Sequence, residues 1–269
     1  MYNLIFSVTG DSLAILLHDA LFSNGERNLR LVTDRELAFA EWLHEAENDG
    51  HFFTRIRLPD GFIIEPQIIK NLVNRIPFFQ MPHFVNGADR QYAEMEMYAL
   101  YTSFLYSVND KVIDGMPVRH INAQDNALYF QLLAAKAGLD ILDNQFTSSP
   151  RWQQPKALAA MAPQKKQTAL WHKKSQHLVW ENKPVLYNEP FEGLVKVEVV
   201  GDKYFCKVDP GRHFAKKVKT FSQLTGRTVY TLLLAEVKGK YKFYTVDTRP
   251  QALGTAALEA FCSLLTGKK

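Results

Sequence analysis

The chain has 269 residues, of which 46% are hydrophobic and 22% are charged. This composition is typical of a globular protein with a sizeable core and excludes a largely disordered chain. The net charge of +4 is too small to indicate binding to nucleic acid or membrane by itself. The length fits one large domain or two small ones.

The first half predicts strands and helices in close alternation. Asp11 or Ser12 caps the first helix, and Asp34 is expected to cap the second, which carries Trp42 and Leu43 on its apolar face. The predicted elements are, in order, strand 2–8, helix 12–24, strand 29–33, the helix from 34, strand 52–58, helix 66–73 and helix 89–108. Strand, helix and strand in short succession indicate a βαβ unit with a parallel sheet.

The last helix of this half is indicated by a regular pattern of side chains. Tyr92, Met95, Ala99, Thr102 and Leu105 recur at spacings of three and four residues. Residues at these spacings lie on one side of an α-helix. The pattern therefore predicts one continuous helix over this stretch.

The second half predicts antiparallel hairpins and helices. Gly201-Asp202 and Lys238-Gly239-Lys240 separate pairs of alternating strands, and such short glycine-containing turns are typical of hairpins. The predicted elements are helix 123–137 between Asn122 and Gly138, a hairpin over about 194–208, helix 214–225, a hairpin over about 228–247 and helix 253–265. The proline-rich connection 148–168 is expected to be irregular.

Together these elements predict an α/β protein whose C-terminal half is α+β. We expect an N-terminal βαβ domain over residues 1–120 and a second domain over 121–269, with an antiparallel sheet and helices. No uninterrupted apolar run reaches about 18 residues, so no membrane span is predicted. The N-terminus lacks the basic start of a signal peptide, and we expect a soluble cytoplasmic protein.

Several common catalytic and metal motifs are absent from the sequence. It contains no GxGxxG, GxxxxGK[ST], GxSxG or HExxH segment. Cys206 and Cys262 are far apart and match no metal spacing, so we interpret both as buried thiols. His172 and His177 are the closest histidine pair, and a spacing of five residues in a polar stretch is weak evidence for a metal site.

One long series of segments resembles a known family. An Asn-Arg pair, Asn74-Arg75, is followed by the helix of DRQYAEMEMYALYTSFLYSV, then by a helix that Asn122 precedes and Gly138 ends, and by Thr147. The series resumes at YNEPFEGLVKVEVVGDKYFCKV and ends at YTVDTRP. It resembles the ATP-grasp ligases, most closely the branch that modifies peptides or small amino acids and carries a pre-ATP-grasp domain in front.

The resemblance implies a pre-ATP-grasp-like domain over 1–120 and a shortened ATP-grasp-like domain with a reduced lid over 121–269. It also implies ATP and magnesium as cofactors. The family's final strand holds Mg²⁺ with a Glu and an Asn, and the corresponding positions here are Thr245 and Asp247. Asp247 brings a charge that favours a hard cation, whereas Thr245 offers only a neutral hydroxyl. The resemblance therefore assigns the metal to Asp247.

Other site residues follow from the same resemblance. Lys173 or Lys174 is expected to contact the ATP phosphates, and Glu189 to accept hydrogen bonds from the ribose or base. Lys196 and Arg249 are expected near the reacting groups. For Arg249 the reason is that a guanidinium at a strand end can grip a carboxylate or phosphate. The alternative for each is an ordinary structural role: a solvated basic turn, a loop-end carboxylate or a surface cation.

The C-terminal half is locally basic and contains interleaved aromatic residues. This indicates either a solvated face or a surface for an anionic partner: a nucleotide, an acidic peptide, a protein or, as an option left open, nucleic acid. An exposed hairpin edge also leaves a homodimer open. The basic residues are Lys203, Lys207, Arg212, Lys216, Lys217, Lys219, Arg227, Lys238, Lys240 and Lys242.

Two functions remain after these observations. The first is an ATP-dependent carboxylate–amine ligase that acts on a peptide or small amino-acid substrate through an acyl phosphate. The second is a catalytically reduced relative that binds a peptide, nucleotide or protein partner. The absence of a recognisable glycine-rich lid loop and the presence of Thr245 favour the second, and the order of the segments favours the first.

Overall fold

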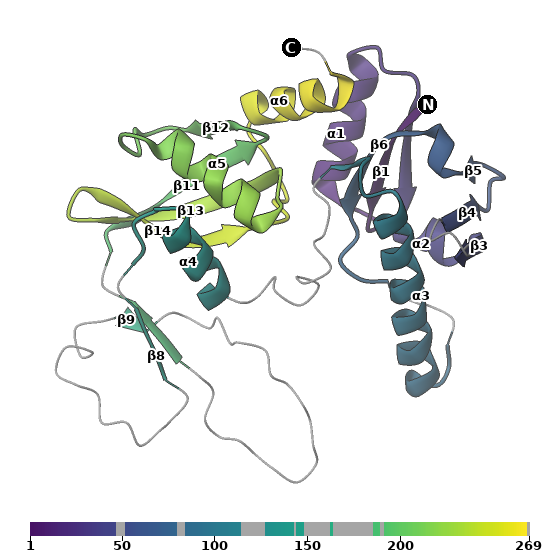
Figure 1. Cartoon of the computed structure of the whole chain (residues 1–269), viewed down its shortest axis with the longest axis horizontal. Coiled ribbons are helices and arrows are strands. Elements are labelled where there is room, and N and C mark those ends of the chain that lie inside the picture. Colours follow the sequence, from purple (N-terminus) through teal and green to yellow (C-terminus); the bar gives the residue numbers. More distant parts are fainter. Residues whose placement is uncertain are drawn as a thin grey trace, which may run out of the picture. The chain divides into compact units, whose positions relative to one another are not determined.

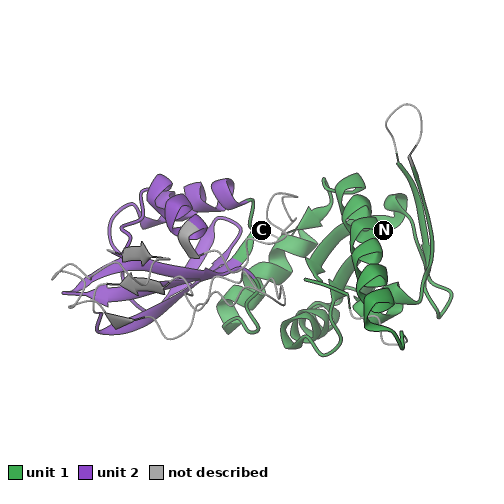
Figure 2. Ribbon diagram, turned by 90° about the horizontal axis from the view of Figure 1, so that it is seen from below, with its two compact units in different colours: residues 1–118, 226–229, 249–269 green, residues 119–225, 230–248 purple. Residues whose placement is uncertain are grey.

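The computed structural model describes residues 1–46, 52–79, 84–113, 127–142, 144–147, 162–163, 185–188 and 191–267. The chain divides into two compact units (Figure 2). Unit 1 contains residues 1–118, 226–229 and 249–269, and unit 2 contains residues 119–225 and 230–248. Each unit is thus assembled from separate stretches of the chain.

Unit 1 is built on a parallel sheet with strand order β2-β1-β6-β7. The strands are β1 (Tyr2–Ser7), β2 (Leu29–Thr33), β6 (Ile69–Arg75) and β7 (Val112–Ile113). The first two predicted strands are confirmed. Leu4 and Phe6 face the main core of this unit, so Ile5, buried between them, points to the opposite face of the sheet.

Four helices of unit 1 follow residues that are common N-caps: Asp11, Thr33, Asn86 and Gly254. They are α1 (Ser12–Ser23), α2 (Asp34–Ala38), α3 (Gly87–Ser107) and α6 (Thr255–Thr266). Asp11 caps α1 by accepting from the backbone N–H of Ala14 at 3.1 Å, as predicted. Helix α1 contacts α6, and in Figure 1 one end of α6 reaches α1.

The second helix is shorter than the sequence predicts. Its cap is Thr33 rather than Asp34, because Thr33 and Glu36 form a reciprocal capping box. The helix ends at Ala38, and Trp42 and Leu43 belong to a strand, β3 (Glu41–Ala46). This strand pairs with β4 (Phe52–Arg57), which pairs in turn with β5 (Ile63–Ile64). Pairing with a strand further along the chain therefore overrides the local helical pattern.

The helix predicted over 66–73 is wrong. Only a single 3₁₀ turn, η1 (Pro66–Ile68), precedes strand β6. Leu72 and Val73 are buried in this strand, which lies between β1 and β7. A short apolar run fits a buried strand as well as a helix, and here the central position in a parallel sheet decides for the strand.

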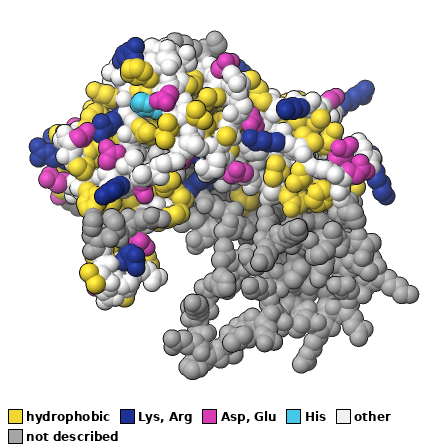
Figure 3. All heavy atoms as spheres, turned by 180° about the vertical axis from the view of Figure 1, so that it is seen from behind, with side chains coloured by type: hydrophobic (Ala, Val, Ile, Leu, Met, Phe, Trp, Pro, Cys, Tyr) yellow, Lys and Arg dark blue, Asp and Glu magenta, His cyan; other side chains and the backbone are white. Residues whose placement is uncertain are grey.

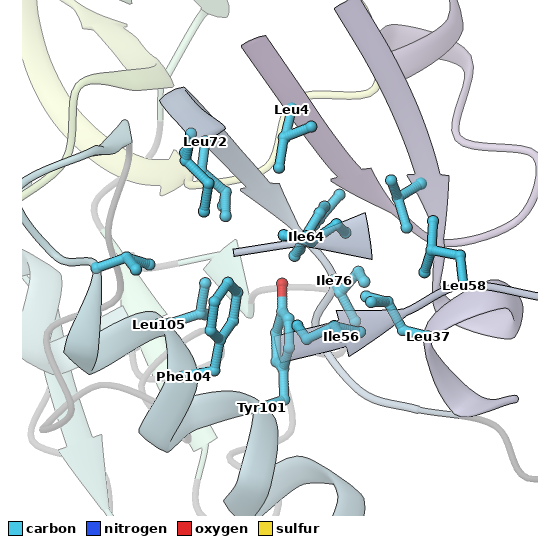
Figure 4. Close-up of a cluster of buried hydrophobic side chains, with 14 of the residues drawn as sticks. Leu4, Leu37, Ile56, Leu58, Ile64, Leu72, Ile76, Tyr101, Phe104 and Leu105 are labelled. Atoms are coloured by element: carbon cyan, nitrogen blue, oxygen red, sulfur yellow. The ribbon is translucent and has the colours of Figure 1, made fainter. Parts of the chain in front are cut away.

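Helix α3 covers the core face of the parallel sheet. Tyr101, Phe104 and Leu105 point from the helix toward Leu4 and Leu72 of the sheet (Figure 4). Tyr101 and Phe104 are fully buried. The hairpin β3–β4 contributes Trp42, whose ring meets Phe104 edge to face. The predicted long helix is confirmed, but the side that it buries is not the one marked by Tyr92 and Met95.

The main sheet of unit 2 has the strand order β12-β11-β13-β14. It contains two antiparallel hairpins, β11–β12 and β13–β14. Helices α4 (Ala127–Lys136) and α5 (Phe214–Thr225) contact each other and pack over one face of it. The strands are β11 (Gly193–Val200), β12 (Lys203–Cys206), β13 (Val229–Val237) and β14 (Lys240–Asp247). Both predicted hairpins are confirmed, with Gly201 at φ 63° and Gly239 at φ 72° in their turns.

A second, three-stranded sheet of unit 2 has the order β8-β10-β9. Its strands are β8 (Asn144–Thr147), β9 (Ala162–Pro163) and β10 (Val185–Asn188), and both pairings are antiparallel. The predicted irregular connection 148–168 lies outside the described residues except for β9. The parallel sheet of unit 1 and the antiparallel sheets of unit 2 confirm the α/β class with an α+β C-terminal half. In the described part of the chain, no helix combines the length and the apolar character that a membrane crossing requires.

A histidine fixes the β3–β4 hairpin to helix α3. One ring nitrogen of His44 hydrogen-bonds the Thr54 hydroxyl at 2.7 Å, and the other the Ser103 hydroxyl at 2.8 Å. Burial lowers the pKa of His44 below its ordinary value of 6.5. The unfolded chain therefore takes up this proton first, so His44 protonation lowers stability as pH falls through 6.5 toward the folded-state pKa.

We expect this titration to be visible in the pH dependence of unfolding. Between about pH 7.5 and 5.5, wild-type protein should lose more stability than the His44→Gln variant, which cannot titrate there. Chemical denaturation at several pH values measures the free energy of unfolding of both proteins. Parallel pH profiles for the two proteins would show that His44 does not contribute.

Candidate functional site

The last strand of unit 2 contains a β-bulge that determines which way its polar residues face. Leu233 pairs with Thr245, but the next residue, Leu234, pairs with Phe243, so Tyr244 is the extra residue on β14. Phe243 and Val246 both belong to the helix-covered core of unit 2, although they are three positions apart and would lie on opposite faces of a regular strand. The bulge allows this, and it places Thr245 and Asp247 together on the opposite face.

A neighbouring strand adds charged side chains to that face. On β11, Val195 and Val197 pack in the core, so Lys196 and Glu198 point away from it. Their side chains form an ion pair of 2.7 Å. We call Lys196, Glu198, Thr231, Thr245 and Asp247 the polar face of the sheet. Lys196, one of the predicted site residues, therefore lies off the core side of its strand.

A buried hydroxyl completes the polar face. Thr231 lies directly opposite Asp247 in the β13–β14 ladder, and directly opposite residues share a face. Thr231 is only 3% exposed, and among the described residues its Oγ1 has no hydrogen-bond partner. A buried hydroxyl without a partner is costly, and such groups require an explanation, a bound ligand or water being one.

The oxygen atoms of the polar face suit a magnesium site in which the protein provides only a few of the ligands. No cluster of three or more His, Cys, Asp and Glu that could hold a metal occurs in the described part of the chain. Mg²⁺, however, is commonly held by one or two carboxylates together with substrate phosphates and water. Asp247 supplies an exposed carboxylate, and Thr231 and Thr245 supply neutral oxygens on the same face. The residues therefore fit a phosphate-bound Mg²⁺ better than a metal held by protein alone.

Unit 1 contains a second group of polar residues at the carboxyl ends of its central strands. Arg75, at the end of β6, donates from Nε and Nη2 to the two carboxylate oxygens of Asp11 at 2.8 and 3.1 Å. Its Nη2 also donates to the carbonyl of Pro250 at 3.0 Å. Both partners of the ion pair are about 6% exposed. This pair fixes the β1–α1 loop and the chain after β14 to the sheet end where ligands gather in α/β folds.

The adjacent residue, Asn74, continues this buried network. Its Oδ1 accepts from the Tyr101 hydroxyl at 2.7 Å and from the backbone N–H of Ile76 at 3.1 Å. Its Nδ2 is buried and has no partner among the described residues. The Asn-Arg pair thus ends a strand, as in the family that the sequence resembles, and it leaves one buried donor unsatisfied at the sheet edge.

Arg249 belongs to unit 1, and its charge affects the pKa values of two tyrosines of α3. Burial raises the pKa of Tyr98 and that of Tyr101, and the positive charge of Arg249 opposes both rises. Arg227, which is 6% exposed, opposes the rise at Tyr98 as well. The two arginines are 22 residues apart in the sequence, and both lie within electrostatic range of one helix. A carboxylate or phosphate would be stabilised in such a setting.

The remaining predicted site residues cannot be placed. Lys173, Lys174, Glu189 and Asn122 lie outside the described residues. Their roles therefore stay predictions. The structure describes Lys196 and Asp247 on one sheet face of unit 2 and Arg249 within unit 1.

The sequence interpretation missed several polar residues of these groups. Thr231 was seen only as part of a strand, Asp11 only as a helix cap, and Arg227 only as one of many cations. The Asp11–Arg75 pair spans 64 residues and has no local signal.

The basic residues of the C-terminal half are mostly solvated. Lys203, Lys207, Arg212, Lys216 and Lys219 are exposed. On the side of the molecule seen in Figure 3, lysines and arginines lie between acidic and apolar side chains rather than in one continuous basic area. This arrangement gives no specific support to a nucleic-acid surface.

The sequence matches no family model and no curated protein. The structure, in contrast, is similar over its whole length to solved structures. Macrocyclase MdnC bound with precursor peptide MdnA, from Microcystis aeruginosa MRC, has a TM-score of 0.77 at 13% identity, with 100% of both chains covered. A RiPP-associated ATP-grasp ligase from Chryseobacterium gregarium, in complex with ADP and a leader and core peptide, has a TM-score of 0.73 at 12% identity, covering 100% of this chain and 98% of that one.

A third similar structure is ATP-grasp ligase PsnB complexed with minimal precursor, Mg and ADP. Its TM-score is 0.70 at 16% identity, with 98% of this chain and 97% of that one covered. At these identities the likeness concerns the fold, and it agrees with the resemblance that the sequence suggested. The chain therefore has the fold of the ATP-grasp ligases.

Proposed function

We propose that this protein is an ATP-dependent ligase that activates a carboxylate of a peptide substrate and joins it to an amine. One observation carries the proposal: the chain matches, end to end, ATP-grasp ligases solved with precursor peptides. The polar face of β11, β13 and β14 supports it, because the strand that the resemblance assigns to the metal carries a carboxylate there, next to a buried hydroxyl that has no partner among the described residues.

The reaction begins with transfer of the γ-phosphoryl group of ATP to a substrate carboxylate, which gives an acyl phosphate and ADP. An amine then attacks the acyl carbon, and phosphate leaves as the amide bond forms. Bound magnesium would neutralise charge on the phosphates. Asp247, with Thr231 and Thr245 beside it, would hold that ion.

The other residues bind and orient the reactants. Arg249 is proposed to grip the substrate carboxylate or the phosphoryl group, since a guanidinium binds either in a bidentate manner. Lys196 is proposed to act as a charge on the polar face, balanced at rest by Glu198 at 2.7 Å. Lys173 or Lys174 and Glu189 are proposed to contact the phosphates and the nucleoside.

Thermal unfolding with and without nucleotide tests the binding half of the proposal. We expect millimolar ATP with Mg²⁺ to raise the melting temperature by several degrees, because saturation at about 100 times the dissociation constant adds about 2.7 kcal/mol to stability. Magnesium alone serves as the control. No shift with ATP and Mg²⁺ would overturn the ligase proposal and favour a protein that only binds a partner.

Trapping with hydroxylamine tests the chemical half. With ATP, Mg²⁺ and peptides rich in Asp and Glu, a ligase of this type is expected to form peptide hydroxamates, detected by mass spectrometry, and ADP in equal amounts. Nucleotide binding without hydroxamate for any acidic peptide would contradict carboxylate activation. It would leave a nucleotide-binding relative without ligase activity.

A further inference from the structure

The side chain of Asn74, near the carboxyl end of β6, presents a buried donor that has no partner in the described part of the chain. The backbone N–H of Ile76 and the Tyr101 hydroxyl both donate to its Oδ1, at 3.1 and 2.7 Å. A backbone N–H can only donate, so the atom that it meets is the oxygen, and the Nδ2 group points the other way. Because Asn74 is only 3% exposed, bulk water does not satisfy this group. A ligand with an acceptor oxygen would do so.

The chain after β14 brings Arg249 to the same end of the sheet. Arg75, which follows Asn74 in the chain, donates to the carbonyl of Pro250 at 3.0 Å. Arg249 directly precedes this anchored residue. Its charge opposes the rise that burial causes in the pKa of Tyr101, and the Tyr101 hydroxyl is the group bonded to Asn74. A cation is therefore held near the Asn74 amide, at the sheet end where ligands gather in α/β folds.

A second arginine reaches this place from the start of β13. Thr231 and Asp247 form the last pair of the β13–β14 ladder, so the chain before Thr231 and the chain after Asp247 leave the ladder as neighbours. Accordingly, the charges of Arg227 and Arg249 both oppose the rise that burial causes in the pKa of Tyr98. Arg227 is only 6% exposed. With five N–H donors, a guanidinium can bind a ligand in addition to its contacts within the protein.

We propose that Asn74, Tyr98, Arg227 and Arg249 form a site in unit 1 that binds a carboxylate of the peptide substrate. We call these four residues the carboxylate site. The two guanidinium groups offset the hydration that the carboxylate loses, and the Tyr98 hydroxyl and the Asn74 Nδ2 group add neutral donors. The inference deepens the proposed function, on which the identity of the ligand as a peptide rests. It adds that recognition of the carboxylate requires neither ATP nor magnesium.

A carboxylate suits this site better than a phosphate group. Burial raises the pKa of Tyr98 although two arginine charges oppose the rise, so the surroundings disfavour negative charge. A phosphate group carries about 1.5 to 2 negative charges at pH 7 and a carboxylate only one, so the phosphate loses more hydration on entering the site. A planar carboxylate also matches the two parallel N–H groups of a guanidinium.

A titration followed by NMR tests the site in the full chain, with tyrosine rings labelled with ¹³C and without ATP or magnesium. The Tyr98 signal is identified by its loss in Tyr98→Phe. We expect acetyl-Gly-Glu-Gly-amide to shift this signal in a saturable manner, with a dissociation constant of about 1 mM or below. The neutral peptide acetyl-Gly-Gln-Gly-amide should cause no saturable shift, and inorganic phosphate should bind at least about threefold more weakly. Equal binding of the two peptides, or tighter binding of phosphate, would overturn the proposal.

Two variants and a matched control assign the binding to these residues. Asn74→Asp keeps an acceptor for Tyr101 and Ile76 but replaces the Nδ2 donor by a charged oxygen, so it should weaken binding of the Glu peptide at least about tenfold. Arg227→Met should do the same, whereas Arg212→Met, at an exposed arginine of unit 2, should leave binding unchanged. Unchanged binding in Asn74→Asp, or an equal loss in Arg212→Met, would contradict the carboxylate site.

The titration is independent of the test for ligase activity, because it contains no nucleotide. Saturable binding of the Glu peptide without hydroxamate formation would support the carboxylate site in a protein that is not a ligase. Hydroxamate formation without binding of the Glu peptide would support the ligase and overturn the carboxylate site.

Discussion

Arg75→Met is expected to lower the free energy of unfolding by about 3–5 kcal/mol, because it leaves the Asp11 carboxylate buried without its counter-ion. In the native protein the two side chains share two hydrogen bonds, of 2.8 and 3.1 Å. The substitution also removes the donor to the Pro250 carbonyl. Chemical denaturation followed by circular dichroism measures the loss.

Arg55→Met is the matched control for this substitution. Arg55 pairs with Glu65 at 2.9 Å, the same kind of contact, but its side chain is 53% exposed. A solvated pair of this kind contributes about 0–1 kcal/mol. Equal losses for the two variants would show that burial does not determine the strength of the Asp11–Arg75 pair. In the double variant Asp11→Ala/Arg75→Met, the loss should be smaller than the sum of the two single losses.

Asp247→Ala is expected to reduce ATP turnover about 100-fold or more, since it removes the one carboxylate of the polar face proposed to hold magnesium, an effect of several kcal/mol. Asp247→Asn should retain part of the activity, because the amide oxygen remains a ligand without its charge. Both variants should fold normally, as Asp247 is exposed at the end of β14. Initial rates of ADP release at several Mg²⁺ concentrations measure the effect.

Asp202→Asn, in the turn between β11 and β12, is the control and should keep full turnover. Thr245→Glu should lower the Mg²⁺ concentration needed for half-maximal rate, because it adds a second carboxylate beside Asp247. Unchanged turnover in Asp247→Ala would remove this residue from the mechanism.

The sequence predicts those elements whose signals are local. Helix α5 runs from Phe214 to Thr225, as predicted, and Gly226 follows it. The hairpin turns are located by glycines with positive φ. These features depend on neighbouring residues only, so a single sequence contains the information.

The wrong predictions concern residues whose structure is decided by distant partners. Strand β6 was predicted as a helix, because the sequence of its seven residues does not show that the segment lies between β1 and β7. Trp42 and Leu43 join a strand because β4 pairs with them. The spacing of Tyr92, Met95 and Ala99 correctly predicted the helix α3. Periodicity alone does not say which side of a helix faces the core, and here the core covers the side of Tyr101 and Phe104.

The candidate site also combines features that have a local sequence signal with features that depend on distant partners. Asp247 and Thr245 were found by their order in the chain, through the family resemblance. Their orientation follows from the bulge at Tyr244, which needs the register with Leu233 and Leu234 to be seen. The hydroxyl of Thr231, which has no hydrogen-bond partner in the described part of the chain, could not be found from the sequence, because burial and pairing are properties of the folded sheet.

The bulge of β14 also determines which changes of chain length this strand should tolerate. Tyr244 is the supernumerary residue, so a deletion there leaves Phe243, Thr245 and Asp247 on the faces they now occupy. A deletion between Thr245 and Asp247 instead moves one of them to the other side of the sheet. Relatives that lack one residue in this strand are therefore expected to align correctly only when the gap is set at Tyr244.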